Sequence, residues 1–437
     1  MKATNRSPYG FACMYRSAHN VGDERLCARP RNASDVAITR IETITQPGGP
    51  SPRLVFVKLY TSDGAVGHGE TYYVPGAVEA FVHDFASHVV LGSDERQIER
   101  LWRRLYEMAA RFGARGAEMR ALSALDVALW DIAGQQANQP IHQMLGGAIM
   151  DSIPVYNTCG GPTYGSSSGI PNRSPYTGDP AEADPHDDLW FAMYDAGTLA
   201  QSLLDDGFTA MKIWPFDPIA QRTGGRLINN AELEEGLGPL RQIREAVGDD
   251  MAVMVEGHGY WQLAPAIKIA RALEEFDPEW LEDLTLAHSV ETLQRLREAT
   301  TIPISVSEFL MTRWEYLPVM QHAAADYIMI DPTWAGGITE SKKIATMADA
   351  FGLPVTAHDC TGPFTMLAGM HLIANAPNGM YQEVVRAFLR YRYSDWVDWM
   401  PEVHHGALSV PDRPGIGAAL VPDLHERPGY QLRVSAV

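Results

Sequence analysis

The segment Val253–Trp261, VMVEGHGYW, contains a run of apolar residues that ends in Glu256 and His258. Apolar residues followed by glycine are typical of a buried strand that runs into a loop. Two later segments, EWLED (279–283) and PISVSE (303–308), have the same form and carry Glu282 and Glu308 near their ends. The glutamates follow one another at intervals of 26 residues, a length that accommodates one strand and one crossover helix.

Eight strand-like segments follow residue 151, and amphipathic helical segments separate most of them. Alternation of strands and helices predicts a parallel sheet, and eight units in about 250 residues predict a closed (β/α)8-type barrel over residues 151–401. The predicted strands are IPVYNT (153–158), AMKIW (210–214), AVMVEG (252–257), EWLED (279–283), PISVSE (303–308), YIMID (327–331), PVTAH (354–358) and MYQEV (380–384).

Residues 36–150 have a different pattern, which is typical of a small α+β domain. Two strand segments flank the turn Ser62-Asp63-Gly64, a combination that predicts a hairpin. Two helical segments follow, and the second (118–147) is broken at Gln139-Pro140. The extension before them, 1–35, has no apolar core of the kind that a signal peptide requires. We interpret residues 1–35 as a poorly ordered arm, as the product of a wrongly assigned start codon, or as an arm that packs on a partner subunit.

The ends of the predicted strands supply the candidate metal ligands, because catalytic groups of such barrels lie at the C-terminal strand ends. Glu256, Glu282 and Glu308 end three consecutive strands, so their carboxylates should converge on one rim of the barrel. Three converging carboxylates cannot all stay ionised without compensation. Oxygen ligands alone favour Mg²⁺ over zinc. We therefore predict a Mg²⁺ site, although any one glutamate could instead be a solvated strand end.

The next two strands end in Asp331 and His358. An aspartate beside an imidazole orients the ring and raises its basicity. This pair predicts His358 as a general base, supported by Asp331, near the metal but on the opposite side of the mouth. The second strand ends with Lys212 and Trp214, and the eighth ends with Glu383.

These motifs together resemble the mandelate racemase branch of the enolase superfamily, over about residues 36–437. The resemblance is carried by ALSALDVALWDIAGQQANQPIHQMLGG (121–147), the three glutamates and IDPTWAGGITE (330–340). It implies an α+β capping domain, completed by the tail (402–437), on a (β/α)7β barrel. It also implies removal of the proton α to a carboxylate, with Mg²⁺ stabilising the enediolate. Lys212 would then assist at that carboxylate, and Glu383 could hydrogen-bond there if protonated.

The step after proton removal separates the possible functions. Racemases of this branch carry K-x-K at the second strand, whereas Trp214 replaces the second lysine here. Galactonate and mannonate dehydratases are similar to this chain in having a histidine two residues after the first metal ligand, the place that His258 holds. There it protonates the departing 3-hydroxyl, which needs a general acid because hydroxide leaves poorly. The resemblance thus favours a Mg²⁺-dependent dehydratase that converts an aldonate or aldarate into a 2-keto-3-deoxy acid. A cycloisomerase, an epimerase or racemase using the same enolate, and a non-catalytic sugar-acid-binding homologue are the alternatives.

Composition excludes other classes of partner. The net charge of −19 argues against nucleic acid and anionic membranes, and no apolar run reaches membrane-spanning length. Four cysteines without a C-x-x-C pair indicate a reduced compartment, so we expect a cytoplasmic protein. Homo-oligomers are common in the resembled family. The expected partner is therefore a small acid sugar.

Substrate specificity should come from the capping domain and from a long polar segment, residues 159–188. That segment, which follows the first barrel strand, either covers the active site or is a long loop without a role there. In the cap, we expect contributions from Tyr72-Tyr73 and the loop 111–118. Arg115 and Arg120 could reach a distal polar group of the substrate or could be solvated surface arginines.

Overall fold

In a computed structural model of the chain, residues 36–49, 53–165 and 184–437 are described. The predicted arm (1–35) and most of the polar segment 159–188 therefore lie outside the described residues. Within the described part, no helix is both long enough and apolar enough to cross a membrane.

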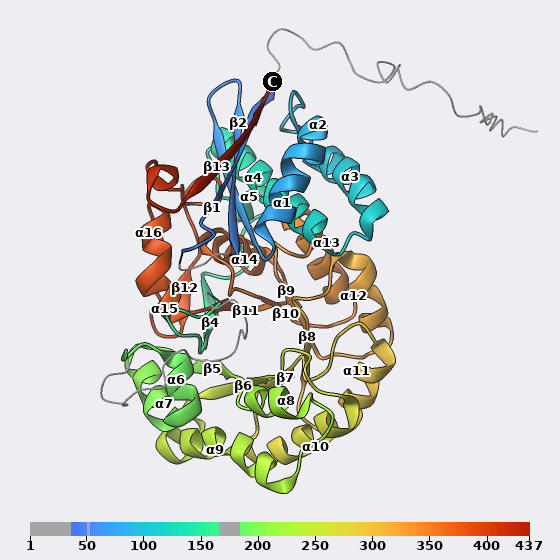
Figure 1. Cartoon of the computed structure of the whole chain (residues 1–437), viewed down its shortest axis with the longest axis vertical. Coiled ribbons are helices and arrows are strands. Elements are labelled where there is room, and N and C mark those ends of the chain that lie inside the picture. Colours follow the sequence, from blue (N-terminus) through green and yellow to red (C-terminus); the bar gives the residue numbers. More distant parts are fainter. Residues whose placement is uncertain (1–35, 50–52, 166–183) are drawn as a thin grey trace, which may run out of the picture. The chain divides into compact units, whose positions relative to one another are not determined.

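The cap is built on a four-stranded antiparallel sheet that joins the two ends of the described chain. Its strand order is β13-β1-β2-β3, so the C-terminal tail adds the edge strand beside β1, where Figure 1 draws it in dark red next to blue. The predicted hairpin at residues 62–64 connects β2 to β3. The strands are β1 (Ile38–Thr45), β2 (Leu54–Thr61), β3 (Val66–Tyr72) and β13 (Gln431–Ala436).

Helices cover one face of the cap sheet, and the longest, α4, packs directly on β3. Gly67 and Gly69 permit this approach, because a Cβ at either position would lie 2.1 Å from a carbonyl oxygen of α4. The predicted break is observed, since Asn138 turns left-handed (φ 53°) before Pro140. The cap helices are α1 (Pro75–Phe81), η2 (Val82–Ala86), α2 (Ser87–Val90), α3 (Ile98–Ala109), η3 (Ala110–Phe112), α4 (Ala117–Ala137) and α5 (Ile141–Met144).

All eight predicted strands form one parallel sheet, and the last pairs with the first. This pairing of β11 with β4 closes the barrel, which confirms a capped (β/α)7β architecture. A short strand, β12 (Ala407–Ser409), pairs antiparallel with β4. The barrel strands are β4 (Ser152–Thr158), β5 (Ala210–Ile213), β6 (Ala252–Glu256), β7 (Trp280–Glu282), β8 (Ile304–Val306), β9 (Tyr327–Ile330), β10 (Val355–Ala357) and β11 (Gly379–Val384).

The helices between these strands surround the barrel (Figure 1). They are α6 (Asp188–Tyr194), α7 (Ala196–Asp205), α8 (Asp217–Thr223), α9 (Asn230–Val247), η5 (Gly248–Asp250), α10 (Leu263–Leu273), η6 (Glu274–Phe276), α11 (Val290–Arg297), α12 (Thr312–Gln321), α13 (Gly337–Ala350) and α14 (Pro363–Asn375). After β11 come α15 (Arg386–Phe388), η7 (Leu389–Tyr393), α16 (Ser394–Trp396) and η8 (Leu424–Glu426).

The barrel interior is filled with large side chains below its mouth. Tyr156, Met254, Trp280 and Met329 come from four different strands and form a buried cluster with Ala210. The rings of Tyr156 and Trp280 meet edge to face at 5.4 Å. Because apolar side chains occupy the interior, polar strand-end groups can gather only above them, at the mouth.

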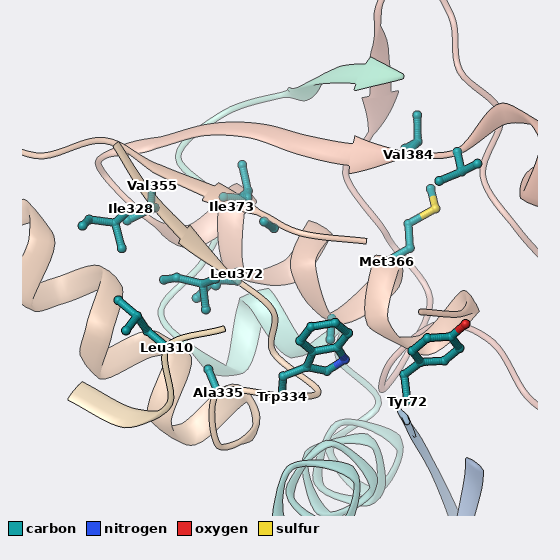
Figure 2. Close-up of a cluster of buried hydrophobic side chains, with 14 of the residues drawn as sticks. Tyr72, Leu310, Ile328, Trp334, Ala335, Val355, Met366, Leu372, Ile373 and Val384 are labelled. Carbon is teal, nitrogen blue, oxygen red and sulfur yellow. The ribbon is translucent and has the colours of Figure 1, made fainter. Parts of the chain in front are cut away.

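The cap packs against the loops at the barrel mouth and forms hydrogen bonds with them. Thr71 Oγ1 donates to Thr333 O (2.9 Å), and the backbone N–H of Thr365 donates to Glu70 Oε1 (2.6 Å). Figure 2 shows Tyr72, from the end of a cap strand, in one hydrophobic cluster with Trp334 from the loop after β9. The end of β3 is therefore fixed against the catalytic end of the barrel.

Candidate active site

The three glutamates predicted as metal ligands lie together in the barrel mouth. Glu256, Glu282 and Glu308 each offer a carboxylate oxygen, and these oxygens lie within 4.8 Å of one another. All three side chains are buried, and Glu256 is in register with Glu282 on the paired strands β6 and β7. Glu308 lies three residues beyond Ser305, the β8 residue in register with Glu282, so the equal sequence spacing does not place all three glutamates at the same strand position.

The electrostatics of this cluster fit a divalent cation. Burial raises the pKa of Glu282 to about 8 and also raises the pKa of Glu308. Glu308 Oε2 is buried and has no hydrogen-bond partner among the described residues. Buried carboxylates of this kind are costly unless a cation or a proton compensates them. The oxygen-only ligand set suits Mg²⁺.

Lys212 lies among the acidic side chains at the end of β5. Its Nζ is 2.5 Å from Glu282 Oε1 and 3.2 Å from both Glu256 Oε2 and Glu383 Oε1. Burial opposes the charge of Lys212, but these carboxylates outweigh it and raise the lysine pKa well above its usual range. Lys212 is therefore a fixed cation at the bottom of the site.

The predicted base and its aspartate form a direct hydrogen bond. His358 Nδ1 lies 2.8 Å from Asp331 Oδ2, and Thr333 holds Asp331 Oδ1 through its backbone N–H and its hydroxyl. Burial disfavours the charged ring, but Glu383 and Asp331 raise the pKa of His358 well above its usual value. A divalent cation among the glutamates would oppose this effect and favour the neutral ring.

Glu383 lies beside two basic side chains of the barrel mouth, Lys212 and His358. Burial raises its pKa, but Lys212 and His358 outweigh burial and hold the pKa below the usual range. Thr158 Oγ1 and the backbone N–H of Asp359 also donate to it. Glu383 therefore accepts hydrogen bonds and compensates the two neighbouring cations.

His258 has a partner that sequence reasoning missed. Its Nδ1 lies 2.7 Å from Asp217 Oδ2, and its Nε2 lies 3.2 Å from Glu256 Oε1. Burial lowers the pKa of His258, but Glu256 and Asp217 raise it to about 9. The backbone of His258 is left-handed (φ 45°), a strained conformation that is typical of functional positions. Asp217 ends the segment KIWPFD (212–217), and nothing in that segment indicates a contact with the loop after β6.

One cavity brings both histidines together with residues of the cap. Tyr164 and Gly165, where the first described stretch of the polar segment ends, also line it. The lining residues are Arg53, Tyr72, Tyr73, Tyr164, Gly165, Lys212, Glu256, His258, Glu308, Phe309, Trp334, His358 and Cys360.

Of the two arginines considered as substrate contacts, Arg115 lies on the surface and Arg120 is buried. Arg115 is half exposed and pairs with Glu315 at 3.1 Å, so it is a surface residue. Arg120 is buried, and its guanidinium lies 3.9 Å from the ring centre of Trp334 and 5.1 Å from that of Tyr73. Arg120 thus supports two rings that line the cavity. Trp214 is buried and packs edge-on against the His258 ring at 5.5 Å.

Comparison with protein families agrees with this architecture. Residues 41–146 match the mandelate racemase/muconate lactonizing enzyme N-terminal domain, and residues 195–424 match the enolase C-terminal domain-like family. The chain belongs to the mandelate racemase/muconate lactonizing enzyme family of the enolase superfamily.

Relatives within this family share most of the chain. Arabinonate dehydratase of Saccharolobus solfataricus is 30% identical over 370 residues, which cover 83% of this chain and 87% of that protein. A D-galactonate dehydratase family member of Streptomyces bingchenggensis is 27% identical over 92% of this chain and 96% of its own. A crystal structure of an enolase of the mandelate racemase subgroup from Agrobacterium tumefaciens has 40% identity and a TM-score of 0.80, covering 92% and 99% of the two chains.

Proposed function

We propose that this family member is a hydro-lyase that dehydrates a sugar acid, an aldonate or an aldarate. The observation that carries the proposal is the presence of two acid–histidine pairs at one cavity, His358 with Asp331 and His258 with Asp217. Dehydration needs one group to remove the C2 proton and another to protonate the 3-hydroxyl as it leaves. The dehydratase names of the two relatives support the same class.

Glu256, Glu282 and Glu308 would hold Mg²⁺. When bound, this cation would supply positive charge for the oxyanion that develops at the substrate carboxylate. Lys212, buried beside the glutamates, would add fixed positive charge at the same place.

The histidine pairs would carry out the proton transfers. His358 would take the C2 proton at Nε2, while Asp331 stabilises the resulting imidazolium through Nδ1. His258, which Asp217 holds through Nδ1, would donate a proton from Nε2 to the 3-hydroxyl. The C3–O bond then breaks, water leaves, and the enol tautomerises to a 2-keto-3-deoxy acid. Trp214 has no group that could exchange a proton on the opposite face.

The test is a screen of C5 and C6 aldonic and aldaric acids with Mg²⁺, with products identified by NMR. We expect a 2-keto-3-deoxy acid from at least one substrate. An isomer of unchanged composition would instead identify a cycloisomerase or an epimerase. Tight binding without any turnover would overturn the enzymatic proposal and indicate a sugar-acid-binding homologue.

A further inference from the structure

A second group of metal-ligating side chains lies beside the three glutamates. His358, Cys360 and Glu383 each offer one ligand atom, and these atoms lie within 4.8 Å of one another. They come from the ends of β10 and β11, which pair with each other. Because this set combines nitrogen, sulfur and oxygen, it differs in kind from the oxygen-only glutamates. We propose that these three residues form a separate site for a thiophilic divalent cation, zinc in particular.

The separations between the ligand atoms are close to those of a zinc site. His358 Nε2 lies 3.8 Å from Glu383 Oε2, and Cys360 Sγ lies 3.9 Å from Glu383 Oε1. Tetrahedral zinc with bonds of about 2.0–2.3 Å places its ligand atoms roughly 3.3–3.6 Å apart. These two separations involve different oxygens of Glu383, so coordination would need side-chain rotations that draw the three ligand atoms, now within 4.8 Å of one another, closer together.

The neighbouring hydrogen bonds already orient these ligands. Asp331 occupies Nδ1 of His358 at 2.8 Å, which leaves Nε2 directed toward Glu383. A carboxylate behind a metal-bound histidine is the usual outer support of zinc sites. The backbone N–H of Asp359 fixes Glu383 at 3.0 Å. His358 and Cys360 line the cavity, so a fourth ligand, water, can reach the metal from there.

Zinc bound in this way would block the reaction. Coordination would form bonds to nitrogen, sulfur and oxygen, release the thiol proton of Cys360 to solvent, and involve no change of oxidation state. The Nε2 lone pair of His358 would then be unavailable to remove the C2 proton. This inhibitory consequence rests on the proposed role of His358 as the base, whereas zinc binding itself does not.

Metal binding can be measured without any substrate. The full-length protein, saturated with Mg²⁺, is titrated with Co²⁺ as a spectroscopic substitute for zinc, and zinc is then added to displace it. Thiolate-to-cobalt absorption reports only sulfur ligation, so Co²⁺ among the glutamates does not contribute. We expect this absorption in the wild type and in the control Cys159→Ser, because Cys159 lies outside the cluster. Cys360→Ser and Cys360→Ala should lose it.

The loss of Cys360 should weaken zinc binding by at least about tenfold, since even outer-shell partners of a metal are worth 10–100-fold in affinity. Cobalt absorption that is absent from the wild type, or unchanged in both Cys360 variants, would overturn the site. With an active substrate, half-inhibition by zinc should need at least about tenfold more zinc in Cys360→Ser, relative to its own activity in Mg²⁺ alone. If no sugar acid is turned over, the proposed function fails, yet the cobalt titration still decides the site.

Discussion

Asp217 Oδ2 lies 2.7 Å from His258 Nδ1, and Asp217 is fully buried at the start of α8. This contact fixes the imidazole so that Nε2 faces Glu256 and the cavity. The contact between Asp331 and His358 has the same form at 2.8 Å. The two histidines therefore differ in their neighbours and not in how an aspartate orients them.

The Asp217→Asn variant should lower the rate of dehydration more than it lowers the rate of C2 proton removal. Loss of a general acid costs roughly 10²–10⁴-fold in rate, and we expect a smaller loss when only the orienting charge of His258 is removed. Exchange of the C2 hydrogen with deuterated solvent should persist, because it needs only His358 and Asp331. Proton NMR of the recovered substrate measures exchange, and product formation measures elimination.

His358→Asn is the matched comparison, because it should abolish both exchange and dehydration. An equal loss of exchange and elimination in Asp217→Asn would show that Asp217 acts on the whole site. Undiminished exchange in His358→Asn would show that another group removes the C2 proton.

Mg²⁺ should stabilise the folded protein, and Glu308→Gln should remove most of this effect. A ligand that binds only the folded state adds about 2.7 kcal/mol at a hundredfold excess over its dissociation constant. Without metal, the variant should be as stable as the wild type or more so, since it removes a buried charge that has an unpartnered oxygen in the described structure. Thermal unfolding with and without Mg²⁺, after chelator treatment, tests both expectations. An equal Mg²⁺-induced shift in both proteins would exclude Glu308 as a ligand.

The sequence was sufficient to predict the barrel and the position of its glutamates. Constant spacing marks Glu256, Glu282 and Glu308 as members of three successive strand–helix units, and the geometry of such sheets brings the ends of neighbouring strands together. Glu256 and Glu282 are the last residues of β6 and β7, whereas Glu308 lies two residues beyond the end of β8. Counting eight strand segments was enough to predict that β11 would close on β4. These features depend on local pattern and on one general rule of topology.

Contacts between separate loops could not be predicted in this way. Asp217 reaches His258 because the loops after β5 and β6 lie side by side, and residue spacing within either loop does not report that contact. Arg120 lies on α4, which is buried on most sides and so lacks the polar stripe that would show which way a residue points. The protonation state of Glu383 depends on Lys212 and His358 from two other strands.

Replacing Lys212 with methionine should destabilise the metal-free protein strongly. The variant leaves Glu256, Glu282 and Glu383 without the cation that contacts all three. Breaking a buried ion pair by removing one partner costs about 3–5 kcal/mol. Mg²⁺ should restore part of this stability, because it compensates two of the same carboxylates. Urea unfolding at matched Mg²⁺ concentrations is the measurement, and an unchanged midpoint would mean that these glutamates are already protonated.

Acid should destabilise the fold partly through His371, on α14. His371 is buried, the backbone N–H of His142 faces its Nδ1 at 3.3 Å, and its Nε2 lies 3.2 Å from Ile416 O. Burial, reinforced by His142, lowers the pKa of His371 to about 3. The unfolded chain, with a histidine pKa of about 6.5, therefore takes up the proton first as the pH falls.

This stability is fully present above about pH 6.5 and is lost as the pH falls from there toward about 3. Between about pH 7.5 and pH 5, one such histidine accounts for about 2 kcal/mol of lost unfolding free energy. His371→Gln keeps a donor toward Ile416 and cannot be protonated. Between the two pH values, the variant should therefore lose about 2 kcal/mol less unfolding free energy than the wild type. The measurement is urea unfolding of both proteins at the two pH values. Subtracting one pH-dependent loss from the other removes the contribution of the titrating groups that the two proteins share. Equal losses in the two proteins would mean that His371 is already charged in the folded state.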